Sequence, residues 1–272
     1  MGLYIGHNLE TVHDIHYSWT GWPSARAGLP QFSPGSLAGL SAALTKDGLV
    51  VEGHTWNTNA VQLSVSAQPD QAPVWISQRL KGRLVYALRH QGTPVAFSRK
   101  VSLRAIGHNR TGVVDRYVRD QLAHVDLADP RYKATLAEVA IHNPAVDLAE
   151  PAASSHGRYW YNLHVVFVVA DRYRVGDRAF LVRLRERVMS VADAQGCALK
   201  RVAIMPDHMH VALRGNPKLS PQDIALGLQN ASADAAGCRL WEHAFYVGTF
   251  GEYDKAAVKA AGRSHRPCAD GE

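Results

Sequence analysis

The chain has 272 residues, a length that suits one large domain or two domains of roughly 100–150 residues each. Apolar residues make up 46% and charged residues 20%, which is ordinary for a soluble globular protein and excludes wholesale disorder. Lysine and arginine exceed the acidic residues by 30 to 24, and this net charge of +6 has the sign that a phosphate-rich partner would need.

Cysteine usage and apolar runs indicate the compartment. The three cysteines, Cys197, Cys238 and Cys268, include no close pair, which argues against a disulfide scaffold and against a CxxC zinc site. No stretch approaches the roughly 18–20 apolar residues of a membrane helix. The opening MGLYIGHNLE lacks the basic segment and apolar core of a signal peptide. We therefore expect a reduced, cytoplasmic protein with no membrane partner.

The first part of the chain alternates helical and extended patterns. Apolar spacing predicts, in chain order, a strand at 13–20, a helix at 37–44, strands at 49–56 and 60–67, a helix at 72–89, a strand near Phe97 and a helix after Gly107. Because two strands follow one another directly, hairpin pairing is favoured over a parallel βαβ arrangement. This order is typical of an α+β fold with a mainly antiparallel sheet.

The same order recurs later, which indicates an internal repeat. The second series is a strand at 162–169, a helix at 181–192, strands at 199–205 and 208–215, and a helix at 220–237. A shift of 148 residues places Ala60 on His208, and a later shift of 144 places Gly107 on Gly251. We align the opening strands 13–20 and 162–169. The alternative is a chance alignment of two generic α+β segments.

The repeat predicts the domain organisation. The first copy spans 1–125 and the second spans 158–272. The segment 126–157 between them is rich in Asp, Ala and Pro, and we interpret it as a linker with room for one helix at 133–142.

The most informative local motif is the pair His208 and His210 in the predicted strand 208–215. Alternate side chains of a strand share a face, so both imidazoles point the same way. Two imidazoles on one strand can bind a divalent metal. Taken alone, an HxH pair is more often a surface feature than a pair of ligands.

Several motifs in order give this pair a context. RYWYNLHVVFVVADRYR (158–174), MPDHMHVAL (205–213), LSPQDIALGL (219–228) and FYVGTFG (245–251) together resemble the signature of the single-tyrosine HUH transposases, which move small insertion sequences and include REP-associated members. The resemblance implies two ferredoxin-like (RRM-like) domains with antiparallel sheets, and a nucleoid-associated protein. It also implies that His208 and His210 bind a divalent metal, while a tyrosine on a later helix attacks a DNA phosphate.

The second copy departs from this family pattern. Counting from the VGTFG motif places the tyrosine at Ala261, which is no nucleophile. Tyr253 comes too early, and we do not nominate it.

The first copy carries the missing helix. GHNRTGVVDRYVRDQL (107–122) resembles the family's tyrosine helix, and its Tyr117 and Gln121 are four residues apart on one helical face. In turn, this copy has Ala60 and Gln62 where the histidines are expected. Each copy therefore keeps what the other has lost.

The complementarity predicts one composite active site. The resemblance implies an arrangement like that of a dimer, in which each active site combines the histidine pair of one subunit with the tyrosine helix of the other. We therefore predict a single-chain pseudo-dimer, monomeric as a chain, whose halves are related by a pseudo-two-fold axis. Tyr117 would be the nucleophile, and His208, His210 and Gln121 would hold the metal. Mixed nitrogen and oxygen ligands favour Mg²⁺ or Mn²⁺, with Zn²⁺ left open.

Single-stranded or hairpin DNA is the expected partner. In the family, the helix that matches 72–89 contacts folded DNA, and here it is basic. Its candidate DNA-binding residues are Arg79, Lys81, Arg83 and Arg89, with Trp75 as a stacking platform and Arg172 and Arg174 as secondary candidates. The alternatives are a solvated charged face and a core tryptophan. We leave His13, His16, His54 and His164 as structural or surface residues.

Three functional hypotheses follow. The first is an enzyme that nicks and rejoins single-stranded DNA through a 5′-phosphotyrosine link, either in transposition or as a domesticated replication or telomere-end nickase. The second is a non-catalytic protein that binds hairpin DNA. The third is an unrelated zinc hydrolase, which predicts that Tyr117 and Gln121 lie far from His208.

Overall fold

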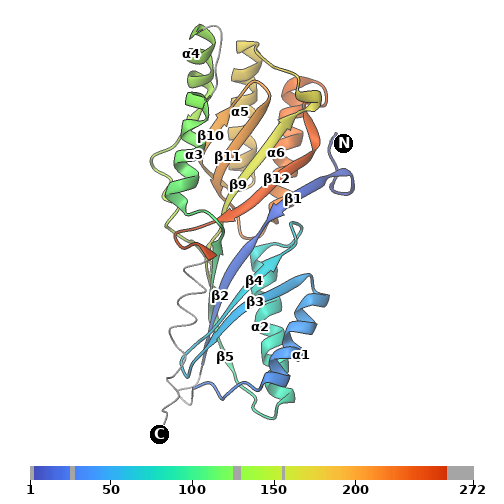
Figure 1. Ribbon diagram of the computed structural model, residues 1–272, viewed down its shortest axis with the longest axis vertical. Helices are drawn as coiled ribbons and strands as arrows, with labels where there is room; N and C mark the ends of the chain where they lie inside the picture. The colour runs from blue at the N-terminus through green and yellow to red at the C-terminus, as the bar shows by residue number, and fades with distance from the viewer. Residues whose placement is uncertain (1–2, 25–27, 125–129, 155–156, 256–272) are drawn as a thin grey trace.

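The computed structural model describes residues 3–24, 28–124, 130–154 and 157–255. They form an elongated molecule with one six-stranded sheet in each half, one above the other in Figure 1. The first sheet has the order β3 (Leu49–Trp56), β4 (Val61–Ala67), β2 (His16–Pro23), β5 (Phe97–Ile106), β8 (Gly157–Trp160) and β7 (Ala152–Ser154). The second sheet has the order β1 (Glu10–Asp14), β12 (Trp241–Phe250), β9 (Asn162–Val169), β11 (His208–Arg214), β10 (Ala198–Ile204) and β6 (Ile141–His142).

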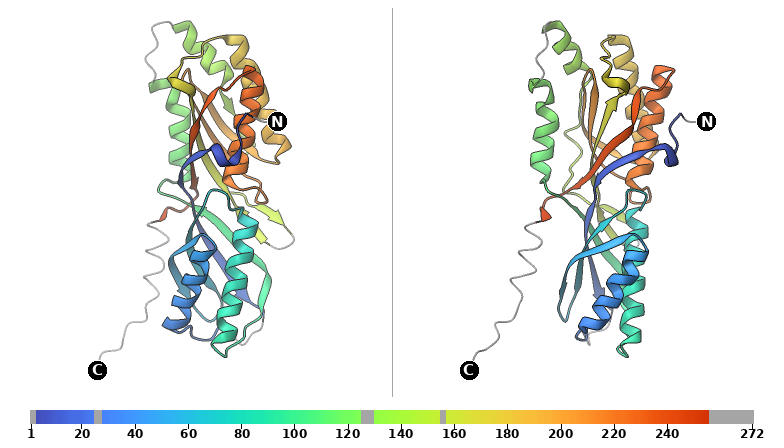
Figure 2. Two further views of the ribbon diagram at one scale, coloured as in Figure 1. Left: turned by 90° about the vertical axis from the view of Figure 1, so that its right-hand side faces the viewer. Right: turned by 45° about the vertical axis from the view of Figure 1, so that its right-hand side comes forward.

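Six α-helices accompany these strands in the described part of the chain. They are α1 (Pro34–Lys46), α2 (Pro73–His90), α3 (Thr111–His124), α4 (Pro130–Val139), α5 (Arg178–Ala194) and α6 (Pro221–Ala236), with short 3₁₀ turns η1 (Gly6–Asn8) and η2 (Ala170–Arg172). Figure 2 (right) shows α1, α2, α5 and α6 on one side of the sheets and α3 and α4 on the other. No helix in these ranges is both long enough and apolar enough to cross a bilayer.

Each half contains the same four-stranded antiparallel unit. Its strand order is β3-β4-β2-β5 in the first half and β10-β11-β9-β12 in the second, and in each half two helices connect the strands as βαββαβ. This is the ferredoxin-like topology. The predicted α+β class with two ferredoxin-like units is therefore confirmed.

The halves exchange strands reciprocally. β1 precedes the first unit but pairs parallel to β12 of the second, and β8 precedes the second unit but pairs parallel to β5 of the first. The registers match: Thr11 pairs with Phe245, and the equivalent pair is Gly157 with Val101. Such i-to-j and j-to-i pairing is what a local two-fold axis produces.

Two glycines mark the crossing of the halves. Gly107 bridges Asp254, and Arg110 bridges Gly251, again as a reciprocal pair. A β-carbon on Gly107 would overlap the carbonyl oxygen of Thr249, and one on Gly251 would overlap that of Ala105. The glycines are therefore required because backbones approach too closely for any side chain.

The alignment of the opening strands was wrong by three residues. His16 pairs with Ser66, and Asn162 pairs with Arg214, so these positions correspond at a shift of 146 rather than 149. The alternating patterns of β1 and β2 run almost continuously, so no feature of the sequence fixed which residue of this stretch aligns with the start of β9.

The segment interpreted as a linker is largely folded. The helix expected at 133–142 is α4, which ends at Val139, and β6 then extends the second sheet by pairing with β10. The hydroxyl of Tyr132 donates to the carbonyl oxygen of Val175 at 2.6 Å, and Arg178 forms an ion pair with Glu138. The segment thus joins the halves and also packs on the second one.

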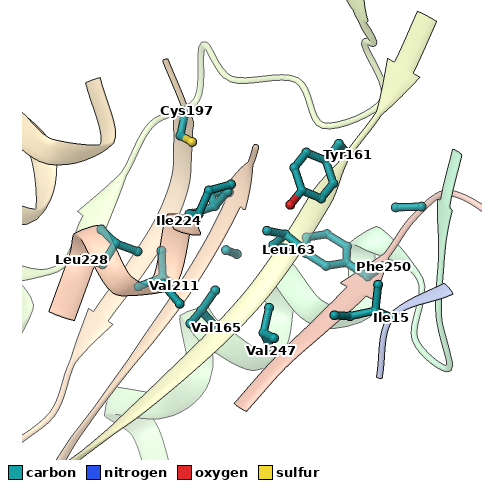
Figure 3. Packing of buried hydrophobic residues seen from close by; sticks show 14 of the residues in the cluster. Ile15, Tyr161, Leu163, Val165, Cys197, Val211, Ile224, Leu228, Val247 and Phe250 are labelled. Carbon is teal, nitrogen blue, oxygen red and sulfur yellow. The ribbon is translucent and has the colours of Figure 1, made fainter. Parts of the chain in front are cut away.

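The core of the second half fixes the face on which the histidines lie. Val211 on β11 lies with Val165, Ile224 and Leu228 in a buried apolar cluster (Figure 3). Because strand residues alternate, His210 must point to the opposite face. Helix α6 packs on this apolar side, and a capping box of Ser220 and Asp223 fixes its first turn.

Candidate active site

Helix α3 carries the first half's tyrosine to the second half's sheet. It follows β5 through the crossing at Gly107, and the amide of Thr111 donates to the carbonyl oxygen of Gly251 at 2.8 Å. The helix then contacts β10 and β11 of the second half (Figure 1). A helix encoded in one half is thereby placed over the strand that bears the histidine pair of the other.

Tyr117 contacts one member of this pair, His210, directly. The centroids of its ring and of the His210 ring are 5.3 Å apart at an interplanar angle of 89°, an edge-to-face contact. A similar contact to His164 on β9 has a centroid separation of 5.8 Å. The side chain of Tyr117 is 49% exposed, so the phenol remains open to a substrate. This proximity contradicts the hypothesis that Tyr117 lies far from the histidines.

In each of the two predicted metal ligands, one ring nitrogen lies within hydrogen-bond distance of a neighbouring side chain. The rings of His208 and His210 are 5.0 Å apart and perpendicular. Nδ1 of His208 lies 2.7 Å from a carboxylate oxygen of Asp207, and Nδ1 of His210 lies 3.1 Å from Nε2 of His164. Neither Nε2 is hydrogen-bonded to a described residue. A ligating histidine with its second nitrogen held by a partner is the usual arrangement at metal centres, so these residues fit a divalent cation.

Burial keeps His210 and its neighbour His164 in the neutral form. Burial lowers the pKa of His164 to about 4, and burial with the charges of His164 and His208 lowers that of His210 to about 3. Both rings are therefore neutral at pH 7, as metal binding requires. Burial tends to raise the pKa of Asp207, but the bond from His208 and the charge of Arg172 hold it below its usual range.

Gln121 lies one turn beyond Tyr117 and is buried. Its amide nitrogen donates to the carbonyl of Tyr117 at 3.1 Å, and its amide oxygen makes no hydrogen bond with a described residue. Within the described ranges, no three or more His, Cys, Asp or Glu side chains form a metal-binding group. Gln121 stays the predicted third ligand.

Two partners of the predicted site residues were missed by sequence reasoning. His164, which we left as structural or surface, stacks on His210 with centroids 5.3 Å apart. Asp207, next to the motif, holds His208. The signal for His164 is its place in β9, two residues from the direct cross-strand partner of His210, and it becomes visible only once β9 is known to pair with β11.

We predict that His164→Phe lowers the affinity for Mn²⁺ by about 10–100-fold, the usual effect of losing a partner of a metal ligand. Phenylalanine keeps the stacked ring but cannot bond to Nδ1 of His210. His164→Gln, which restores an acceptor, should recover part of the affinity. Titration calorimetry with Mn²⁺ measures this, and equal affinities for wild type and His164→Phe would contradict the assigned contact.

An ion pair holds α3 against the second sheet. The guanidinium of Arg201 on β10 contacts both carboxylate oxygens of Asp115 on α3, at 2.9 and 3.2 Å. The Arg201 side chain is 12% exposed, so solvent screens the pair less than an ordinary surface pair. Arg110 and Asp254 form a second ion pair between the halves, with a nitrogen–oxygen distance of 2.9 Å.

We predict that Asp115→Asn lowers the free energy of unfolding by about 1 kcal/mol at pH 7. The bond from Arg201 holds the pKa of Asp115 below its usual value although burial opposes this. The contribution is therefore complete above about pH 4 and is lost as the pH falls through the folded-state pKa. Urea unfolding of a double-mutant cycle with Arg201→Met measures the coupling, and a coupling that is absent at pH 7 would refute it.

The predicted DNA-binding residues of α2 lie apart from Tyr117. Helix α2 belongs to the first half and lies on the opposite side of the sheets from α3 (Figure 2). Arg83 is engaged by Asp47 at 2.8 Å, and Arg79 lies over the Trp75 ring at 5.2 Å from its centroid. The amine of Lys81 donates to the carbonyl oxygen of Ser98 at 2.7 Å. The structure leaves the sequence-predicted residues Arg89 and Arg174 exposed on the surface.

The other secondary candidate lies beside the histidines. Arg172 is 3.4 Å from Asp207, which in turn contacts His208. Roles in DNA binding stay predictions for all of these residues.

The equivalent place in the first half lacks the histidines. There Gln62 donates to the hydroxyl of Ser18 at 2.6 Å, where the second half has His210 and His164. The position expected for a second tyrosine, Ala261, lies outside the described residues.

One family model matches the second half of the chain. The family model described as "Transposase IS200 like" matches residues 158–260. Over these residues the chain is similar to the IS200-like transposases. No curated protein matches the chain significantly.

Solved structures give weaker similarities. A structure described as a candidate transposase from Deinococcus radiodurans R1 shares 22% identity with a TM-score of 0.31, covering 39% of this chain and 90% of its own. An unknown protein from Galdieria sulphuraria shares 12% identity with a TM-score of 0.20, covering 87% and 97%. The ligand-free regulatory subunit of aspartate kinase from Thermus thermophilus shares 12% identity with a TM-score of 0.18, covering 81% and 92%.

Proposed function

We propose that this protein nicks and rejoins single-stranded DNA, with one composite active site per chain. The observation that carries the proposal is the edge-to-face contact between Tyr117 of the first half and His210 of the second, at a centroid separation of 5.3 Å. The half-exposed phenol lies next to His210, and the Nε2 atoms of His208 and His210 have no hydrogen-bond partner among the described residues. This arrangement combines a nucleophile with a metal-binding pair. The similarity of the second half to the IS200-like transposases supports DNA as the substrate.

His208, His210 and Gln121 would hold a divalent cation, Mg²⁺ or Mn²⁺ on ligand chemistry, with Zn²⁺ also compatible. When bound, the cation polarises the scissile phosphate and stabilises the charge that develops on it. Asp207 and His164 orient the two imidazoles.

Tyr117 supplies the covalent step. Its hydroxyl oxygen forms a bond to the phosphorus while the bond from phosphorus to O3′ breaks. The phenolic proton passes to water, and O3′ takes up a proton to leave as a free 3′-hydroxyl. The 5′-phosphate is then linked to Tyr117, and attack by a 3′-hydroxyl reverses the step without ATP. One nucleophile per chain suits single cleavage and rejoining events, so a domesticated nickase fits as well as a mobile element.

A covalent trapping assay tests the proposal. Hairpin-containing single-stranded DNA is labelled at its 3′ end and incubated with the protein and Mn²⁺. We expect an SDS-resistant adduct that carries the 3′ label, together with a released fragment that a polymerase can extend. DNA labelled at its 5′ end should give no labelled adduct, and EDTA should prevent the reaction. Absence of an adduct across varied hairpins would instead favour a non-catalytic hairpin-binding protein.

A further inference from the structure

A cavity of about 700 Å³ lies beside α2 of the first half, and Lys81 alone among its lining residues was discussed as a candidate site residue. It is lined by α2, β5, the β7–β8 pair and Lys218. The lining residues are Val74, Ser77, Gln78, Lys81, Arg99, Val101, Ala153, Ser154, Tyr159 and Lys218. This volume is within the range of small-molecule binding sites.

The cavity is positively charged. Lys81, Arg99 and Lys218 line it, and none of the described lining residues is acidic. Burial and the charge of Arg99 lower the pKa of Lys81, as expected for an ammonium group placed beside another cation without a counterion. An anion in the cavity would supply the missing negative charge.

A buried hydroxyl at this place, that of Ser77, interacts only weakly with the neighbouring Tyr159 side chain. Ser77 is 3% exposed, and its Oγ makes no hydrogen bond of good geometry with a described residue. A buried polar group of this kind costs free energy unless a ligand or water satisfies it. The remaining walls include Val74, Val101 and the ring of Tyr159, which offer an apolar surface.

The equivalent groove of the second half is filled by the chain itself. His243 corresponds to Arg99, and the ring of Tyr4 lies against it with centroids 5.6 Å apart. The Tyr4 hydroxyl donates to the carbonyl of Trp241 at 2.7 Å and accepts from its amide at 2.6 Å. Tyr4 is 1% exposed. In the second half, the fold thus accommodates a planar ring with a polar end in this groove. In the first half, the equivalent groove is the open cavity lined with cations.

We propose that this cavity binds a nucleoside 5′-monophosphate unit. The phosphate would contact Arg99, Lys81 and Lys218 and accept from the hydroxyl of Ser77. The planar base would lie against the apolar wall. The unit could come from a free nucleotide or from the phosphorylated 5′ end of a DNA strand. This inference does not depend on cleavage by Tyr117.

Titration calorimetry with dTMP on the full chain tests the proposal. We expect saturable binding of dTMP and weaker binding of both thymidine and inorganic phosphate. Arg99→Gln should weaken dTMP binding by at least about 10-fold, because it removes a charge-assisted contact. Ser77→Ala, a change that the fold should tolerate, should also weaken it. The matched control is Lys46→Gln, which removes the same charge from the end of α1 outside the cavity.

A 5′-phosphorylated oligonucleotide identifies the source of the ligand. Competition with dTMP indicates a DNA end, and binding of dTMP alone indicates a free nucleotide. The proposal is overturned if dTMP does not bind, if phosphate binds as tightly as dTMP, or if Arg99→Gln behaves like Lys46→Gln. Tyr117→Phe should leave dTMP binding unchanged, so failure here is distinguishable from failure of the cleavage proposal.

Discussion

Tyr117→Phe is expected to abolish the covalent DNA adduct, with a loss of at least about 10³-fold in the rate of its formation. Phenylalanine keeps the ring that contacts His164 and His210 at its edges, so the position of α3 should not change. Only the oxygen that would bond to phosphorus is removed. Denaturing gels of trapped reactions measure the loss, and binding of the same hairpin in gel-shift assays should stay within a few-fold of wild type.

The chain offers a matched control in Tyr246→Phe. Tyr246 on β12 also contacts His164, with ring centroids 5.9 Å apart. Burial and the charge of Asp14 raise the pKa of its phenol, which makes it a poor nucleophile. This variant should form the adduct at a near wild-type rate. An adduct that persists in Tyr117→Phe and disappears in Tyr246→Phe would assign the nucleophile to β12 instead.

His210→Ala is expected to reduce adduct formation by about 100-fold or more, because loss of a ligand exceeds the 10–100-fold effect of losing a ligand's partner. Its affinity for Mn²⁺, measured by calorimetry, should fall in parallel. The local symmetry supplies the control: Gln62 occupies the equivalent position in the first half and bonds only to Ser18. Gln62→Ala should retain the activity. Equal losses in the two variants would mean that the two halves contribute alike, against a single site.

Much of the fold could be predicted from periodicity. The order of strands and helices in each half follows from alternation in segments such as 60–67 and from helical spacing in segments such as 72–89. The glycines at 107 and 251 aligned because both lie at the crossing, where a β-carbon would overlap the other half's backbone. The sequence showed the two aligned glycines, but only the structure shows the close approach of the backbones that requires them.

Other features depend on contacts between distant segments, which periodicity does not encode. The alignment of β2 with its equivalent strand β9 was wrong by three residues. The contact of His164 with His210 depends on the pairing of β9 with β11, which the motifs did not indicate. The segment 126–157 was interpreted as a linker because it is rich in Asp, Ala and Pro, but its described elements α4 and β6 pack against α5 and β10. The ion pair of Arg83 with Asp47, which is distant in sequence, could not be predicted from helical spacing, and the phosphate contact of Arg83 stays a prediction.

The placement of Tyr117 beside the histidine pair followed from the complementarity of the two halves. Each half lacks what the other carries, and the structure brings the phenol and His210 into contact. The ion pair between Asp115 and Arg201, which holds the helix there, could not be predicted from the sequence, because neither residue belongs to a motif.

A mixing experiment tests most directly whether one chain builds one site from both halves. Tyr117→Phe lacks the nucleophile but keeps the histidines, and His210→Ala has the opposite defect. If the tyrosine helix serves the histidines of its own chain, a mixture of the two variants should form no more adduct than the two measured separately. Recovery of a substantial fraction of wild-type adduct in the mixture would show that the tyrosine acts on another chain, and would contradict the composite site.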